Sequence, residues 1–233
     1  MIAISERKEM KMKIKIIKNG PYLVTGAVPL VEKIIKPVGR HYEYKDGRKL
    51  PQKKKYSLCR CGNSKNPPFC DGSHSEIDFE GKEVAERNDY EERAELIEGE
   101  EIDLRDDHRC ALARFCHTEL GSTWELTRKS GKKENRKEAI KSANECPSGR
   151  LTTVNKEGED IEDEYAPQIE ILQDPEKKVS SAIYVKGDIE IEAADGETYE
   201  NRNRTALCRC GRSSNKPFCD GSHVHSGFKD EEE

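Results

Sequence analysis

The chain has 233 residues, of which 37% are charged and only 33% are hydrophobic, and its net charge is −5. No apolar run is long enough to span a bilayer and the N-terminus lacks the apolar core of a signal peptide, so we expect neither membrane insertion nor secretion. The negative net charge disfavours general binding to nucleic acid. Nine cysteines in a chain that we expect to be cytoplasmic indicate metal ligation or redox chemistry rather than disulfides.

Two similar strand pairs are predicted, one early and one late in the chain. Residues 22–30 and 183–191 have apolar residues and a central glycine in register, so each predicts a strand that bends at the glycine into another strand. Residues 13–17 predict an edge strand ahead of the first pair. The first copy also carries a longer loop, which we assign to the basic stretch 45–55.

The segment that links the two copies has a different composition. Residues 76–107 hold 15 acidic and 4 basic residues. Apolar spacing predicts helices over residues 90–97, 107–115 and 133–146, the last closed by Pro147, and a strand over residues 169–172. The charged tail, residues 229–233, is predicted to be frayed.

Six of the nine cysteines lie in a block of sixteen residues that occurs twice. The first block begins at Cys59 and the second at Cys208, and they agree at 13 of 16 positions. Each block supplies three thiols and one imidazole, a donor set suited to zinc, copper(I) or iron–sulfur clusters. Asp71 and Asp220 follow the third cysteine and are natural helix N-caps, so a helix is predicted to begin there.

The block, Cys-x-Cys-x2-Ser-x3-Pro-x-Cys-Asp-Gly-Ser-His, resembles the CDGSH motif of the mitoNEET iron–sulfur family, in a tandem two-motif form. The resemblance implies one [2Fe-2S] cluster in each copy. In each, the first two cysteines would hold one iron and the third cysteine and the histidine the other. The implied ligands are Cys59, Cys61, Cys70 and His74 in the first copy and Cys208, Cys210, Cys219 and His223 in the second.

A structural zinc site is the alternative for each block, because three cysteines and one histidine also form a zinc ligand set. If iron is bound, one imidazole in place of a thiolate raises the reduction potential. A proton at the ligating nitrogen competes with the metal, so acid is expected to loosen the cluster. We therefore expect His74 and His223 to set the potential and to be the labile ligands.

The remaining three cysteines lie in the linking segment. Cys110, Cys116 and Cys146, the last followed by proline, resemble the pattern of a divergent mono-cluster ferredoxin. Three cysteines suffice for a [3Fe-4S] cluster, whereas Ala113 stands where a fourth ligand is expected, and His108 or His117 would have to replace it. Two interpretations stay open: buried cysteines in a helical insert, or a third cluster.

These observations predict an α+β protein with two small β-rich CDGSH modules that form an intrachain pseudo-dimer with a shared β-cap, and a partly helical middle insert. The predicted divisions are 13–80 for the first module, 81–178 for the middle segment, 179–228 for the second module and 229–233 for the tail. No catalytic motif is evident, so we expect no enzyme. We expect a soluble, cytoplasmic monomer that transfers electrons or clusters to redox or iron–sulfur acceptor proteins. The alternative is a redox- or iron-sensing module whose cluster occupancy controls partner binding.

Overall fold

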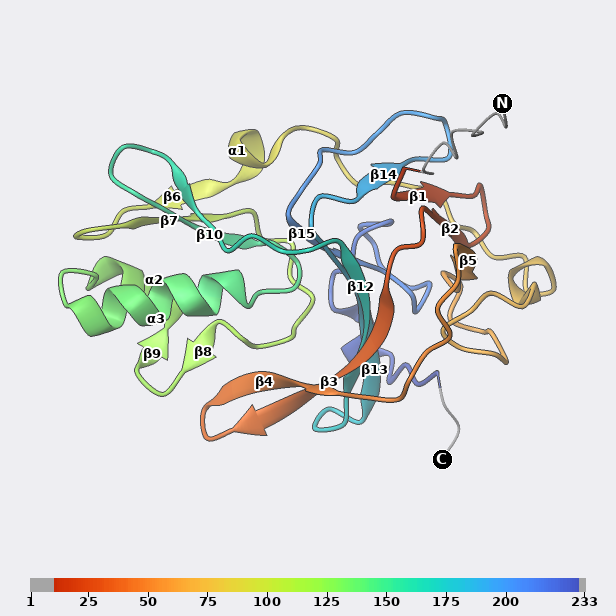
Figure 1. Cartoon of the computed structure of the whole chain (residues 1–233), viewed down its shortest axis with the longest axis horizontal. Coiled ribbons are helices and arrows are strands. Elements are labelled where there is room, and N and C mark those ends of the chain that lie inside the picture. Colours follow the sequence, from red (N-terminus) through yellow and green to blue (C-terminus); the bar gives the residue numbers. More distant parts are fainter. Residues whose placement is uncertain (1–10, 231–233) are drawn as a thin grey trace, which may run out of the picture.

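The computed structural model describes residues 11–230 and has a β-rich α+β fold with few, short helices. Its strands form two sheets of four, one sheet of five and one of two. No helix among the described residues is long and apolar enough to cross a membrane. In Figure 1 the linking segment forms one end of the molecule and the N-terminal strands form the other.

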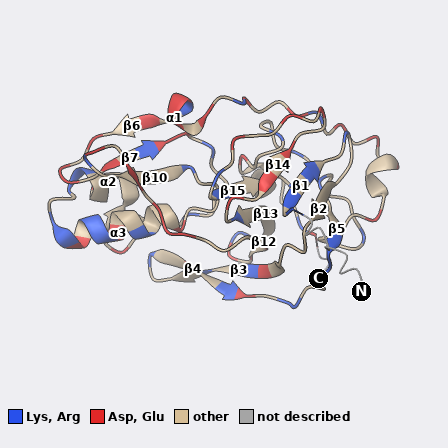
Figure 2. Cartoon of the chain, turned by 45° about the horizontal axis from the view of Figure 1, so that its top comes forward, with Lys and Arg blue, Asp and Glu red and all other residues tan. Residues whose placement is uncertain are grey.

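The first sheet combines strands from both copies of the repeat, in the order β14-β1-β2-β5. Its strands are β1 (Lys13–Ile16), β2 (Tyr22–Thr25), β5 (Lys55–Leu58) and β14 (Glu190–Glu192). β1 and β14 run parallel, and Figure 2 shows basic residues on β1 beside acidic residues on β14. The lysines of β1 form ion pairs with the glutamates of β14, including Lys15 with Glu192 at 2.6 Å. The N-terminal strand is therefore interior to its sheet, and its prediction as an edge strand is wrong.

The second sheet also joins the two copies, in the order β15-β13-β12-β3-β4. Its strands are β3 (Leu30–Val38), β4 (His41–Asp46), β12 (Gln168–Asp174), β13 (Val179–Lys186) and β15 (Arg204–Leu207). β3 runs parallel to β12, with Leu30 opposite Ile169. Neither copy of the repeat therefore completes a sheet from its own strands.

The linking segment is built around a third sheet, in the order β11-β10-β7-β6, against which two helices pack. Its elements are α1 (Tyr90–Arg93), β6 (Glu95–Ile97), β7 (Asp103–Asp106), β8 (His117–Thr118), β9 (Gly121–Ser122), α2 (Thr123–Arg128), α3 (Lys133–Asn144), β10 (Leu151–Val154) and β11 (Asp160–Ile161). α2 begins with a capping box between Ser122 and Glu125. α3 buries Ala139 and Ala143 against its neighbours.

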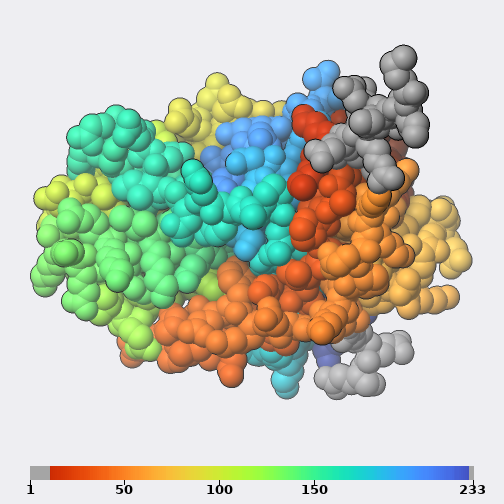
Figure 3. Space-filling model, viewed as in Figure 1, coloured from red at the N-terminus to blue at the C-terminus, as the bar shows by residue number. Residues whose placement is uncertain are grey.

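The β3–β4 hairpin connects the first copy to the linking segment. Tyr44 on β4 stacks on Phe115, with ring centroids 4.3 Å apart, and its hydroxyl donates to the Glu145 carbonyl. Figure 3 shows this segment along the lower edge of the molecule, reaching from the N-terminal region to the linking segment. Much of the extra length of the first copy therefore forms β4, and only residues 47–54 form the predicted loop.

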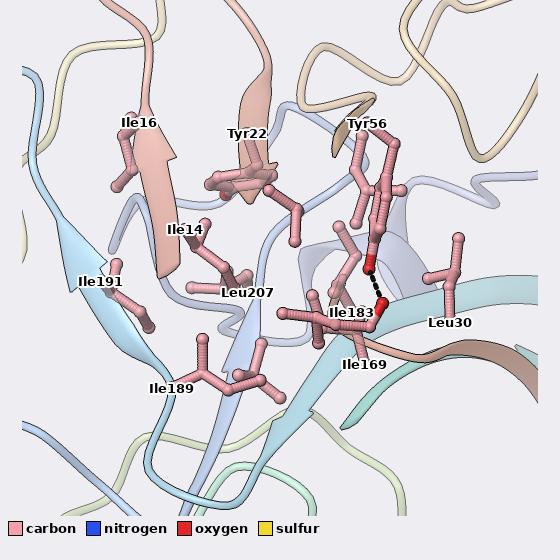
Figure 4. Close-up of a cluster of buried hydrophobic side chains, with 14 of the residues drawn as sticks. Ile14, Ile16, Tyr22, Leu30, Tyr56, Ile169, Ile183, Ile189, Ile191 and Leu207 are labelled. Atoms are coloured by element: carbon pink, nitrogen blue, oxygen red, sulfur yellow. Dashed lines mark hydrogen bonds between the residues drawn. The ribbon is translucent and has the colours of Figure 1, made fainter. Parts of the chain in front are cut away.

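The main core lies between the first and second sheets and draws on both copies. Ile14, Ile191, Ile169 and Leu207 are among its buried members (Figure 4). Tyr56 is buried with them and donates its hydroxyl hydrogen bond to the Val28 carbonyl at 2.9 Å. Burying one such isoleucine stabilises the fold by about 1.5–3 kcal/mol, so the shared core links the two copies energetically.

Several predicted elements are confirmed. The strand pairs bend at Gly26 and Gly187, which have φ of 87° and 76°. A side chain at Gly26 would approach the Met12 backbone to 2.5 Å, so the bend requires glycine. The helix predicted over residues 133–146 is α3, and the strand predicted over residues 169–172 lies within β12.

Two predicted helices are wrong. Only the first turn of residues 90–97 is helical, as α1, and the rest forms β6. Residues 107–115 are an irregular loop, because His108, Leu112 and Arg114 have φ of 63°, 55° and 70°, which a right-handed helix does not accommodate.

The prediction that residues 229–233 are frayed is wrong at the start of this segment. Asp230 forms an ion pair with Arg209 and its side chain is only 5% exposed. Residues 231–233 lie outside the described residues.

Candidate metal centres

The Cys-x-Cys pair of each block follows a strand directly. β5 ends before Cys59 and β15 ends before Cys208. The Sγ atoms of Cys59 and Cys61 are 3.7 Å apart, and those of Cys208 and Cys210 are 3.6 Å apart. The structure therefore places both thiols of each pair on the same side of the chain.

The third cysteine and the histidine of each block form a second pair of donors. Cys70 Sγ lies 3.4 Å from Nδ1 of His74, and Cys219 Sγ lies 3.4 Å from Nδ1 of His223. The histidines lie on single helical turns, η1 (Ser73–Ser75) and α4 (Ser222–His225), which turn each ring toward its cysteine. Nδ1 is thus the nitrogen on the thiol side in both copies.

The spacing within each pair fits two ligands of one metal. Two thiolates bound at about 2.3 Å to a tetrahedral metal lie about 3.8 Å apart, and a thiolate and an imidazole nitrogen about 3.6 Å apart. Within residues 11–230, no three histidine, cysteine or carboxylate side chains are arranged around a single metal ion. The four donors of each block therefore form two separate pairs.

One thiol of each Cys-x-Cys pair has a lowered pKa and therefore ionises more readily than an ordinary cysteine. The Cys61 thiol, with the backbone N–H groups of Gly62 and Ser64, lowers the pKa of Cys59 below its usual value. The Cys210 thiol and neighbouring backbone N–H groups likewise lower the pKa of Cys208. Because the thiolate is the form that binds metal, each pair offers a ligand at neutral pH.

The aspartates that recur in the two blocks, Asp71 and Asp220, do not cap helices as predicted. The N-cap positions are Gly72 and Gly221, in left-handed conformation, and no side chain caps either turn. Instead, the carboxylate of Asp220 accepts hydrogen bonds from the N–H groups of Ser222 and Ser214, at 3.0 and 2.8 Å. Asp71 does the same in the first copy. The aspartate thus ties both ends of the metal-binding loop together.

The two blocks lie against each other. A side chain at Gly62 would come within 2.6 Å of the Cys210 carbonyl oxygen, and one at Gly211 within 2.4 Å of the Cys61 carbonyl oxygen. The hydroxyl of Tyr22, from the first copy, donates to the Cys208 carbonyl at 2.8 Å. The two Cys-x-Cys loops are therefore in reciprocal backbone contact, which only glycine permits at these positions.

A buried arginine supports each loop, a role that the sequence analysis did not assign. Arg60 is 1% exposed and donates through Nε to the Gly20 carbonyl at 2.9 Å; Arg209 is 3% exposed and donates through Nε to the Ser181 carbonyl at 2.6 Å. The sequence signal for this role is that both blocks place an arginine between their first two cysteines.

The three remaining cysteines come together. Cys110, Cys116 and Cys146 line one small cavity, together with Trp124 and Arg150. The Leu112 N–H donates to Cys110 Sγ at 3.3 Å. Burial raises the pKa of Cys116 to about 12. The predicted grouping is thus present in space, although the residues around the first two cysteines are not helical.

No histidine completes this third group. His108 and His117 are exposed, and neither lines the cavity. Cys146 Sγ instead lies 3.3 Å from the Ser148 hydroxyl. The cavity therefore offers three thiols and one hydroxyl.

The paired donors, twice repeated, define this protein as one with soft-ligand metal centres. A family model described as "Iron-binding zinc finger CDGSH type" matches residues 19–75 and 181–224, and one described as "Divergent 4Fe-4S mono-cluster" matches residues 97–156. The chain therefore carries two CDGSH iron–sulfur domains on either side of a divergent mono-cluster region.

A human relative carries the same kind of domain. CDGSH iron-sulfur domain-containing protein 3, mitochondrial, from Homo sapiens, is 41% identical over 49 residues, which make up 21% of this chain and 34% of that protein. The chain thus matches about a third of the length of this curated relative. No solved structure matches the chain.

Proposed function

We propose that this protein binds two [2Fe-2S] clusters through the donors of its two blocks and transfers electrons or clusters between other proteins. The observation that carries the proposal is the division of each donor set into two pairs, each spaced for one metal. A two-iron cluster needs two such pairs, whereas a structural zinc site gathers four donors around one ion. The bound cluster would supply one-electron redox chemistry.

The protein's own residues would hold and tune this centre. Cys59 and Cys61 would hold one iron, with Cys70 and His74 at the other, and the second block would do the same with Cys208, Cys210, Cys219 and His223. A neutral imidazole in place of a thiolate makes the site less negative, which favours the reduced state.

The strand exchange between the copies supports an intrachain pseudo-dimer with a shared β-cap. β14 of the second copy lies beside β1 of the first, and β3 of the first copy joins the sheet of β13 and β15. The single chain thus contains both modules of a pseudo-dimer that would otherwise need two chains. We propose that the protein works as a monomer, in the cytoplasm, on redox or iron–sulfur acceptor proteins, and that it is not an enzyme.

A third cluster is proposed at Cys110, Cys116 and Cys146. Their shared cavity, with the N–H group of Leu112 directed at Cys110, supports this over three buried structural cysteines. With three thiols, a [3Fe-4S] cluster is the type we expect.

Metal analysis of anaerobically purified protein tests the proposal. We expect coloured protein with iron and acid-labile sulfide in equal amounts at the two blocks, and visible bands that bleach reversibly on reduction. Colourless protein with stoichiometric zinc would contradict it. Loss of the cluster on oxidation, rather than reversible reduction and oxidation, would favour a redox- or iron-sensing module over a protein that transfers electrons or clusters.

A further inference from the structure

The two CDGSH sites have the same donors but not the same surroundings. In the second site Cys219 is 3% exposed and His223 is 2% exposed. The matching Cys70 and His74 of the first site are both half-buried. A cluster at the first site would therefore be the more accessible of the two.

The first cause of this difference in burial is one residue that differs between the two copies. Nε2 of His223 lies 3.1 Å from the Ser181 hydroxyl. The matching position of the first copy is Gly20, because the carbonyls of both residues accept the Nε–H of the motif arginine. Within residues 11–230, His74 has no hydrogen-bond partner at Nε2. Only the second histidine is held at both ring nitrogens.

The second cause lies seven residues after each histidine. Phe228 packs on the second Cys-x-Cys pair as Phe79 packs on the first. Only in the second copy does a carboxylate fix this segment: Asp230 pairs with Arg209 and its N–H donates to the Ser180 hydroxyl. The matching residue of the first copy is Gly81, whose N–H donates to Asn19 instead. Nη1 of Arg60 is consequently buried without a hydrogen-bond partner.

The third cause is the linking segment, which covers only the second site. A side chain at Gly221 would meet Leu112 at 2.6 Å and the Cys110 carbonyl at 3.5 Å. At the matching Gly72, no other atom of residues 11–230 lies within 4 Å. Ala111 packs in the same buried cluster as Cys219. The loop of the linking segment thus lies directly on the second CDGSH turn.

We propose that the first site hands its cluster to an acceptor protein, while the second site retains its cluster. This rests on the proposed function. Handover moves a [2Fe-2S] cluster without a change of charge: three iron–thiolate bonds and one iron–imidazole bond to this chain break, and four bonds to the acceptor's cysteine thiolates form. The four protons that the acceptor thiols lose are taken up by the freed ligands of this chain and by solvent, and no electron is transferred.

The test mixes the iron-loaded full chain with a plant-type apo-ferredoxin that has four cysteine ligands, then separates the two and measures iron in each over time. We expect one fast phase that carries about one cluster per chain. The fast phase should be lost in C59S/C61S and kept in C208S/C210S. A fast phase that persists in C59S/C61S would overturn the proposal, as would a single phase that carries both clusters in the wild-type chain.

Point variants give a second measurement that does not depend on emptying a site. Ser181→Ala removes the contact to His223, and Leu112→Ala removes the cover of Gly221. Loss of one hydrogen bond should make release from the second site about fivefold faster in Ser181→Ala, and Ser181→Thr should keep the slow rate. Leu120→Ala, at a residue 47% exposed, is the matched control for Leu112→Ala. Unchanged slow rates in both Ser181→Ala and Leu112→Ala would count against the proposal.

Failure of this proposal is distinguishable from failure of the proposed function. Iron and sulfide are measured before mixing. If neither is bound, the cluster assignment itself is wrong; if both sites are loaded and release together, only the inequality of the sites is wrong.

Discussion

Arg60 and Arg209 occupy matching positions between the first two cysteines of each block, yet they differ in how their charge is balanced. Both donate to backbone carbonyls deep in the fold. Arg209 also pairs with Asp230, whereas Arg60 packs its guanidinium over the rings of Tyr22 and Phe79. Arg60 therefore fixes the turn between β1 and β2 to its Cys-x-Cys loop, and Arg209 fixes β12 and β13 to the other.

Replacement of Arg60 by leucine should destabilise the protein. The carbonyls of Gly20 and Ile17 would lose their donor in a buried place, at a cost of about 2–4 kcal/mol. We expect a lower thermal midpoint and less iron at the first site. Arg212→Leu, an exposed arginine of the second block, is the control, and an equal loss there would contradict the assigned role.

The two histidines are predicted to limit the acid stability of the clusters. A proton competes with iron for the imidazole nitrogen, so a thiolate at the same position should hold iron to lower pH. We expect His74→Cys and His223→Cys each to retain visible absorbance at a lower pH than the wild-type chain. Unchanged acid stability in both variants would show that another ligand is the labile one.

At the scale of elements, Asp106 at the end of β7 organises the cavity of the three cysteines. Its carboxylate accepts two hydrogen bonds from Arg150, at 2.6 and 2.7 Å, and one from the Trp124 indole N–H. Burial raises the pKa of Asp106, but Arg150 and the other donors lower it more, so that the net pKa is below its usual value. The carboxylate is therefore ionised at neutral pH and holds two of the residues that line the cavity.

Asp106→Ala should lower the thermal midpoint, because it leaves the charge of Arg150 unpaired at a cost of about 2–3 kcal/mol. Since the folded-state pKa lies below the unfolded value of about 3.9, the ion pair stabilises the fold fully above that pH and is lost as the pH falls through the folded pKa. The difference between wild type and variant should therefore shrink in acid. Glu98→Ala, at an exposed acid just after β6, should match the wild-type midpoint at every pH; a similar loss there would contradict the assignment.

The elements that could be predicted from the sequence are those fixed by local pattern. The glycine bends at Gly26 and Gly187, the apolar face of α3 and the repeated candidate ligands can each be recognised from neighbouring residues in the sequence. The loop around Cys110 was mistaken for a helix because its left-handed residues are held by distant contacts, such as the ion pair of Arg114 with Asp174. No local pattern shows that Gly20 and Ser181 matter to the two sites, because Ser181 meets His223 only in the folded chain and Gly20 takes the matching place only through its contact with Arg60.

At the scale of the whole molecule, the exchange of strands between copies predicts that they unfold together. β1 of the first copy pairs with β14 of the second, and β3 of the first copy pairs with β12, which leads into the second copy. Hydrogen exchange should therefore show the amides of these four strands opening with one common free energy. Two groups of amides, one for each copy, with clearly different opening free energies would contradict a shared cap.

The central claim is that each block binds a two-iron cluster through three cysteines and one histidine. Pulsed EPR of the reduced protein measures this directly, since it detects the magnetic coupling of a cluster to a ligand nitrogen. We predict an imidazole nitrogen coupling in the wild-type chain that disappears in His74→Cys/His223→Cys, while about four irons per chain stay bound at the two blocks. Reduced wild-type protein with a cluster signal but no nitrogen coupling would contradict the claim.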